Sequence, residues 1–151
     1  MRDFKTILFA TDFSECSTAA FDYAYSLAKQ CSAKLVLVHV VSEPVDMRGF
    51  YVPHISFDVL EQEIIDGAKN LMDSFCTEHL KSGDDYSTAV VSGLAYEEII
   101  NQAKLAKADL VVMGTNGRSG LDHMLFGSTA EKVVRKSPIP VLTVSAVCSE
   151  A

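Results

Sequence analysis

Apolar residues fall into two kinds of pattern along the chain. Short, nearly continuous apolar runs, which are too short for helices, alternate with longer segments in which apolar residues recur every three or four positions. The runs predict buried strands at residues 5–10, 35–41, 86–91, 109–113 and 141–144. The periodic segments predict helices at residues 15–30, 57–80, 97–107 and 129–136, and Ser14 is the predicted N-cap of the first helix. This alternation predicts a single-domain α/β fold over residues 1–151, with a five-stranded, mostly parallel sheet flanked by helices.

Residues 42–56 follow neither pattern. They contain two prolines and a glycine among several apolar residues. An irregular segment of this length inside a compact domain is usually functional or disordered. Two alternatives stay open: the segment folds over a ligand or a partner subunit, or its apolar residues only cover the edge of the core.

The stretch from Val111 to Glu131 has the residue order of a phosphate-binding loop, with a strand end, a glycine-rich loop and a helix start. Gly114 and Gly117 carry no Cβ, so their N–H groups can approach a ligand closely. Gly127-Ser128-Thr129 would then present a helix's first free N–H groups and the positive end of its dipole, which favour an anion. Two alternatives need no ligand: an S-x-x-E capping box at this helix start, or a flexible surface loop.

Three loops follow strands whose carboxyl ends lie together in such a sheet. They are Ala10-Thr11-Asp12, Val40-Val41 and the loop that begins at Gly114. Parallel α/β sheets bind ligands at this edge, where the strand order reverses. A carboxylate, an apolar wall and a phosphate cradle at one place suit a nucleotide. The alternative for Asp12 is that it only complements the dipole of the following helix.

Charge and composition exclude several classes of partner. The net charge of −7 and the lack of any basic run argue against nucleic acid. The longest apolar run, residues 35–41, falls far short of the roughly 20 residues that span a bilayer. The N-terminal apolar run is too short for a signal peptide. Four widely spaced cysteines lack the C-x-x-C pattern of a zinc site. We therefore expect a cytoplasmic protein with reduced cysteines and no membrane partner.

The sequence also lacks the motifs of several enzyme classes. No glycine is followed by lysine as in a Walker A loop, and neither G-x-G-x-x-G nor G-x-S-x-G occurs. The four histidines have no metal-ligand spacing, and His39 in its apolar strand is interpreted as a satisfied core residue. A receiver-type phosphoacceptor domain needs paired acids after the first strand and a lysine after the fifth. Here Asp12 stands alone and Lys136 precedes the fifth strand.

These residues together resemble the universal stress protein family from Ile7 to Val144. The most specific element is Gly114-x2-Gly117-x9-Gly127-Ser128, the ATP-binding signature of the family's nucleotide-binding branch. The supporting elements are Thr11-Asp12-Phe13-Ser14-Glu15, Leu37-Val38-His39-Val40, Glu97-Glu98-Ile99-Ile100, Val112-Met113-Gly114 and Ser137-Pro138-Ile139-Pro140-Val141-Leu142. Ala10 and Asn116 depart from commoner family choices, but neither is a signature position.

The resemblance implies a Rossmann-like sheet of the adenine nucleotide alpha hydrolase type. It also implies a homodimer assembled through the last strand, Val141 to Val144, whose free edge suits antiparallel pairing. The expected ligand is ATP, or ADP or AMP, with Mg²⁺ as a candidate accompanying ion.

The resemblance also assigns expected roles to residues of the site. Adenosine would lie against Ala10, Thr11 and Asp12, with Asp12 near the ribose or a bound metal ion, and Val40 would contact adenine. Met113, Gly114 and Gly117 would form the loop, and Gly127, Ser128 and Thr129 would hold the phosphates. Arg118 adds a charge for the polyphosphate by our own inference.

Three functional hypotheses follow. The leading one is a cytoplasmic, dimeric stress-response protein that binds ATP and whose bound state is read by a protein partner. It is favoured because a complete phosphate cradle stands beside a missing catalytic apparatus. The second is a slow ATPase or self-phosphorylating protein in which Asp12 holds Mg²⁺ and Ser128 or Thr129 accepts phosphate. The third is a dimeric interaction module that needs no nucleotide, in which residues 42–56 bind a protein partner.

Overall fold

The computed structural model describes residues 1–42, 57–116 and 126–145. Within them, five strands form one sheet in the order β3-β2-β1-β4-β5, and each neighbouring pair is parallel. The strands are β1 (Thr6–Ala10), β2 (Lys34–Ser42), β3 (Tyr86–Gly93), β4 (Leu110–Gly114) and β5 (Val141–Val144). The helices are α1 (Glu15–Cys31), α2 (Phe57–His79), α3 (Ala95–Leu105) and α4 (Ser128–Lys136). The predicted α/β fold with a five-stranded parallel sheet is confirmed.

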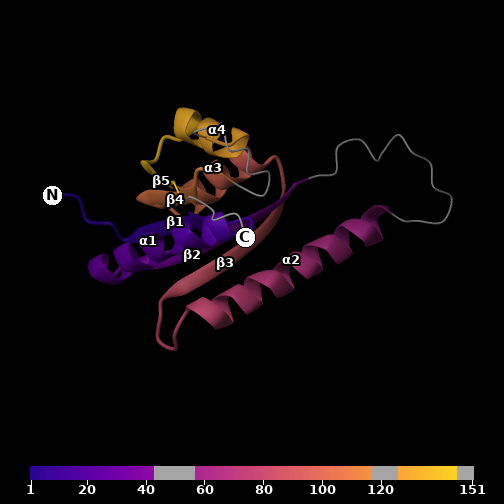
Figure 1. The fold of residues 1–151 in the computed structure, drawn as a ribbon, viewed down its shortest axis with the longest axis horizontal. Coiled ribbons are helices and arrows are strands. Elements are labelled where there is room, and N and C mark those ends of the chain that lie inside the picture. The colour runs from indigo at the N-terminus through magenta and orange to yellow at the C-terminus, as the bar shows by residue number, and fades with distance from the viewer. Residues whose placement is uncertain (43–56, 117–125, 146–151) are drawn as a thin grey trace.

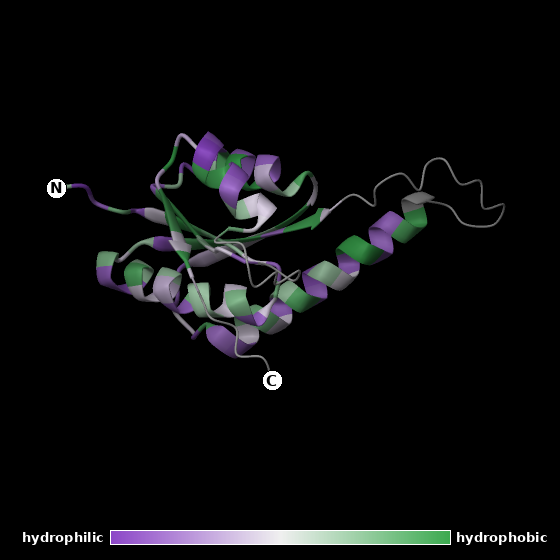
Figure 2. Ribbon diagram, turned by 45° about the horizontal axis from the view of Figure 1, so that its top comes forward, coloured by the Kyte–Doolittle hydropathy of each residue, from purple (hydrophilic) through white to green (hydrophobic). Residues whose placement is uncertain are grey.

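Helices cover both faces of the sheet. Figures 1 and 2 show α1 and α2 on one face and α3 and α4 on the other. On the α1–α2 face, Phe9, Phe21 and Phe75 pack together with ring centroids 5.2 to 6.1 Å apart. On the α3–α4 face, Ile99 and Val133 belong to a second apolar core. Because β1, β4 and the first half of β2 are buried between these two layers, their sequences are nearly continuous apolar runs.

The helix starts agree with the prediction at α1 and differ from it at α3. Ser14 is the N-cap of α1, as predicted, and its Oγ accepts a main-chain N–H of the first turn at 3.2 Å. α3 begins at Ala95, before the predicted start at Glu97. The reason is that the Leu94 carbonyl already accepts the Glu98 N–H at 3.0 Å. Glu97 and Glu98 therefore lie within the first turn, where they complement the helix dipole.

α2 extends beyond the sheet that it covers. Its C-terminal half contributes Met72 and Phe75 to the core of the α1–α2 face. Its N-terminal end runs past the other elements (Figure 1). Within the described residues, neither α2 nor any other helix is long and apolar enough to cross a membrane.

The cysteines differ from the expectation. Cys16, in the first turn of α1, is disulfide-bonded, so the prediction of reduced cysteines is wrong for this residue. Cys31 and Cys76 carry free thiols. Spacing along the chain does not report which cysteines approach one another in space. The cysteines therefore do not support the prediction that the protein lies in a reducing compartment.

Candidate functional site

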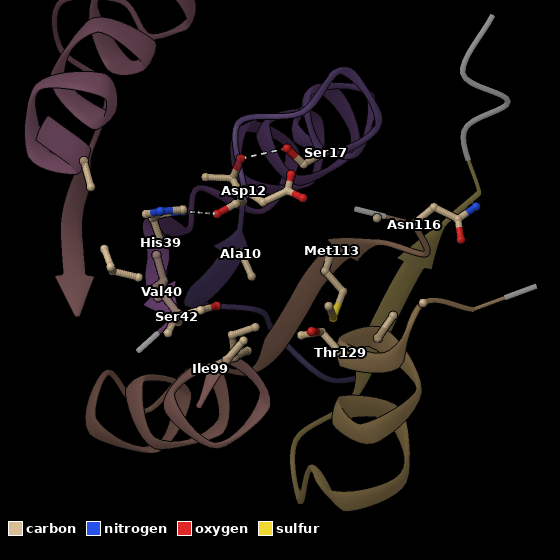
Figure 3. A pocket seen from close by; sticks show the side chains of 18 of the residues that line it. Ala10, Asp12, Ser17, His39, Val40, Ser42, Ile99, Met113, Asn116 and Thr129 are labelled. Atoms are coloured by element: carbon tan, nitrogen blue, oxygen red, sulfur yellow. Dashed lines mark hydrogen bonds between the residues drawn. The ribbon is translucent and has the colours of Figure 1, made fainter. Parts of the chain in front are cut away.

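A cavity of about 740 Å³ opens at the carboxyl ends of β1, β2 and β4, beside the start of α4 (Figure 3). β1 lies at the point where the strand order reverses, because β2 and β4 flank it on opposite sides. This is the position at which doubly wound parallel sheets bind ligands. The cavity therefore lies where the sequence predicted a site.

Every predicted site residue within the described part of the chain lines this one cavity. These residues are Ala10, Thr11, Asp12, Val40, Met113, Gly114, Gly127, Ser128 and Thr129. The two remaining predictions, Gly117 and Arg118, lie outside the described residues. Residues 43–56 of the predicted irregular segment also lie outside the described residues. Its first residue, Ser42, is described and lines the cavity.

The loop between β1 and α1 is fixed by hydrogen bonds centred on Thr11. Its N–H donates to the Val38 carbonyl at 2.9 Å, and its Oγ1 accepts the Phe13 N–H at 2.9 Å. The hydroxyls of Thr11 and Ser17 lie 2.8 Å apart. Ser17 donates its one hydroxyl proton to the Ser14 carbonyl at 3.0 Å, so Thr11 must be the donor to Ser17. Hydrogen bonds to β2 and to α1 therefore fix the loop that carries Asp12.

Asp12 lies on this loop and lines the cavity (Figure 3). Its Oδ1 accepts the Ser14 N–H at 3.0 Å, just before the first turn of α1. The helix-start role considered for Asp12 is thus present together with its place in the cavity wall. Among the described residues, no group of three or more His, Cys, Asp or Glu side chains could hold a metal ion.

His39 also lines the cavity, which the sequence did not predict. Its Nδ1 lies 2.8 Å from the Thr11 carbonyl, so this nitrogen carries a proton and donates it. Its ring packs against Phe13, with centroids 4.5 Å apart. His39 is therefore hydrogen-bonded through Nδ1, as the interpretation required. Its half-buried ring, however, borders the cavity as well as the core.

The start of α4 excludes the capping box, one of the alternatives for the glycine-rich stretch. The N-cap is Gly127, with Ser128 as the first helical residue, so the S-x-x-E capping box does not form. Within the described residues, no side chain caps this helix start. The hydroxyl of the neighbouring Thr115 is also buried, and its Oγ1 has no hydrogen-bond partner among those residues. At one end of the cavity there are therefore helix N–H groups and a buried hydroxyl that have no partner among the residues that the structure describes.

Gly114 lies where the end of β4 approaches the first turn of α1 closely. A Cβ at this position would lie 3.3 Å from the Cys16 carbonyl oxygen, so α1 leaves little room for a side chain. The glycine lets β4 end directly against the start of α1, beside the cavity.

β2 continues past its pairing with β1. The register ends with Val38 opposite Ala10, whereas β2 runs on to Ser42 alongside β3. The Val38 carbonyl accepts the Thr11 N–H, so alternate residues of β2 direct their main-chain groups to the β1 side. Val40 is the next such residue. Its N–H and C=O therefore face the cavity beyond the end of β1.

The sequence matches the family model described as the universal stress protein family over residues 3–145. The chain belongs to the universal stress protein family. The universal stress protein YxiE of Bacillus subtilis is 34% identical over 146 residues, a match that covers 93% of this chain and 99% of YxiE. The resemblance predicted from the sequence motifs is thus confirmed.

Solved structures of family members have the same fold. The structure of MJ0577, a universal stress protein of Methanocaldococcus jannaschii, superimposes with a TM-score of 0.84 at 29% identity and covers 98% of this chain and 100% of that one. A universal stress protein solved in complex with cAMP has a TM-score of 0.60 at 24% identity, covering 95% of this chain and 98% of that one. At that identity the likeness concerns the fold alone.

Several lining residues escaped the sequence prediction. They are Ser17, Val38, His39, Ser42, Ile64, Gly67, Ala68, Leu71, Ala95, Ile99, Thr115, Asn116 and Ala130. Most lie on helices, where amphipathic spacing marks a covered face but not what covers it. His39, Thr115 and Ala130 each adjoin a predicted site residue along the chain, and this signal could have found them.

Proposed function

We propose that the cavity binds an adenine nucleotide, ATP or its products ADP and AMP, and that a protein partner reads the bound state. The observation that carries this proposal is the start of α4, which opens on the cavity and has no side-chain cap among the described residues. Such a helix start favours phosphate through its N–H groups and its dipole. In this proposal Gly127, Ser128 and Thr129 hold the phosphates. Gly117 of the signature and, by our own inference, Arg118 also contribute to phosphate binding.

Val40 supports adenine as the base. Its N–H and C=O lie side by side along the open part of β2 and offer one donor and one acceptor. Adenine presents the complementary pair, with N1 as an acceptor next to the N6 amino donor. Guanine presents an acceptor and a donor in the reverse order at the same edge. The strand therefore favours adenine over guanine.

Asp12 is the proposed contact for the ribose or for Mg²⁺. A carboxylate accepts hydrogen bonds from ribose hydroxyls, and its oxygen is a ligand type that Mg²⁺ prefers. An ion beside Asp12 would take its other ligands from phosphate oxygens and water, because the described residues hold no cluster of ligating side chains. Ala10, Met113 and Gly114 then line the adenosine and the turn toward the phosphates.

The substitution Gly127→Val tests the phosphate cradle. Gly127 has a φ of −68°, a conformation open to other residues, so the variant should fold. The added side chain crowds the helix N–H groups, and ATP affinity should fall by at least about tenfold, or about 1.4 kcal/mol. Calorimetric titration of ATP with Mg²⁺ measures this change. Asn101→Ala, at an exposed α3 position outside the cavity, is the control and should leave affinity unchanged. Equal affinities in both variants would sink the proposal.

A slow ATPase or a self-phosphorylating activity is the second candidate. Ser128 is exposed at the cavity, so its hydroxyl is accessible at the proposed phosphate end. Steady ATP turnover that disappears in Asp12→Asn would favour this candidate. Binding with only trace hydrolysis would favour the regulatory function.

We further propose a homodimer in the cytoplasm. β5 lies at one edge of the sheet, and its four residues are only half-buried. A second β5 pairing antiparallel would cover this edge. Size-exclusion chromatography with light scattering should give twice the mass of the chain, and a monomer at micromolar concentration would contradict the assembly. The cytoplasmic location stays a prediction.

A further inference from the structure

The cavity continues beneath α2, beyond the residues assigned to the nucleotide. We call this part the α2 lobe; it is lined by His39 and Val41 of β2 and by Ile64, Gly67, Ala68 and Leu71 of α2. The lobe lies on the α1–α2 face of the sheet, since the His39 ring packs on Phe13, which contacts the core of that face. Val40, by contrast, packs against the core of the opposite face.

The α2 wall of the lobe is apolar and open. Residues 64, 67, 68 and 71 are spaced i, i+3, i+4 and i+7, so they share one face of the helix. Farther along the same helix, Met72 and Phe75 are buried in the core. At the lobe, however, Ile64 is 42% exposed and Leu71 is 52% exposed. An apolar face that borders a cavity and is left open in this way suits an apolar ligand group.

Gly67 leaves open space along the α2 wall of the lobe. A glycine inside a helix is less stable than alanine, so its presence in the middle of α2 calls for a reason. Packing supplies none, because a Cβ at Gly67 would meet no described atom within 4 Å. A side chain at this position would instead extend from the wall of the lobe into open space. A large side chain at position 67 would therefore occupy space along the lobe.

The lobe adjoins the place proposed for the ribose. His39, which lines the lobe, donates to the Thr11 carbonyl at 2.8 Å, and Asp12 is the next residue along the chain. Figure 3 shows His39 and Asp12 on neighbouring parts of the cavity wall. If the ribose lies against Asp12, its hydroxyls lie beside the lobe.

We propose that the α2 lobe receives an apolar group carried on a ribose hydroxyl of the bound adenine nucleotide, such as an acyl or aromatic ester. The proposal rests on the nucleotide function proposed above. The walls of the lobe are aliphatic apart from one imidazole, so the group is uncharged and apolar.

The test compares ATP with 2′/3′-O-(N-methylanthraniloyl)-ATP, which carries an aromatic ester on the ribose. The ester should strengthen binding to the wild-type chain by at least about fivefold, because it buries apolar surface. In Gly67→Leu the leucine fills the lobe, so the two affinities should become equal. Asn70→Leu, at an exposed position of the same helix that does not line the cavity, should keep the wild-type ratio.

Two measurements separate the outcomes. The thermal midpoint of Gly67→Leu should rise, since leucine favours the helix more than glycine does, and this shows that the variant is folded. Equal binding of both compounds by the wild type, or an unchanged ratio in Gly67→Leu, would overturn the lobe proposal. No binding of unmodified ATP would overturn the nucleotide function itself, which is a separate failure.

Discussion

Thr11 forms hydrogen bonds through its N–H, its carbonyl and its hydroxyl. The N–H binds β2 at Val38, the carbonyl accepts from His39, and the hydroxyl connects the loop to Ser17 of α1. The following Phe13 has a φ of 63°, a left-handed conformation that costs a non-glycine residue about 1–2 kcal/mol. At the scale of the residue, this set of bonds therefore holds Asp12 in a strained turn at the cavity, as expected of a preorganised site.

The substitution Ser17→Ala tests this hydrogen-bond set. Ser17 is 4% exposed and is the acceptor for the Thr11 hydroxyl, so alanine leaves a buried donor without a partner. Urea denaturation should show a loss of about 1–3 kcal/mol in the free energy of unfolding.

Thr18→Ala is the matched control for Ser17→Ala. The Thr18 hydroxyl bonds the same Ser14 carbonyl at 3.1 Å, but the residue is half-buried and is not bonded to Thr11. Its loss should be no more than about 1 kcal/mol. Equal losses in the two variants would show that the Thr11–Ser17 bond contributes nothing special.

At the scale of elements, Asp84 joins the turn before β3 to α1. Its carboxylate accepts the Lys81 N–H at 2.7 Å and the Tyr25 hydroxyl at 2.9 Å, and it pairs with the Lys29 ammonium. The Lys29 ammonium, followed by the Lys81 N–H, lowers the pKa of Asp84 from 3.8 to about 2. The ionised carboxylate is thus more stable in the folded chain than in the unfolded one.

Asp84→Asn should remove a pH-dependent part of the stability. A lowered folded-state pKa gives stabilisation that is fully present above the unfolded pKa of 3.8 and is lost as the pH falls toward 2. The wild type should therefore exceed the variant in stability at pH 6, and the difference should shrink between pH 4 and pH 2. Urea denaturation across this range measures it. Asp85→Asn, at the exposed neighbouring position, is the control, and an identical pH profile for the two variants would refute the role of Asp84.

Elements could be predicted from the sequence where one physical signal dominates. The buried strands were predicted because parallel strands covered on both faces need continuous apolar runs, and the start of α1 because Ser14 suits an N-cap. The sequence could not decide what lies at the start of α4, because Ser128 fits a capping box as well as a phosphate cradle. Only the backbone geometry of Gly127 distinguishes the two.

At the scale of the whole molecule, the sequence predicted which strand ends meet but not how large the site is. The carboxyl ends of β1, β2 and β4 converge because the topology of a parallel sheet requires it. The wall from Ile64 to Leu71 escaped prediction because amphipathic spacing is the same whether core or ligand covers the helix. Ser17 was missed because its role depends on a hydroxyl that lies close only after folding.

Calorimetry of nucleotide-free protein is the strictest test of whether these converging strand ends bind an adenine nucleotide. ATP and GTP are titrated separately with Mg²⁺, after a check for co-purified nucleotide, and cAMP serves as a competing ligand. We expect ATP to bind in the micromolar range, about −8 kcal/mol, and GTP to bind at least about tenfold more weakly because its base edge does not match Val40. No heat with ATP, or equal affinity for GTP, would contradict the account.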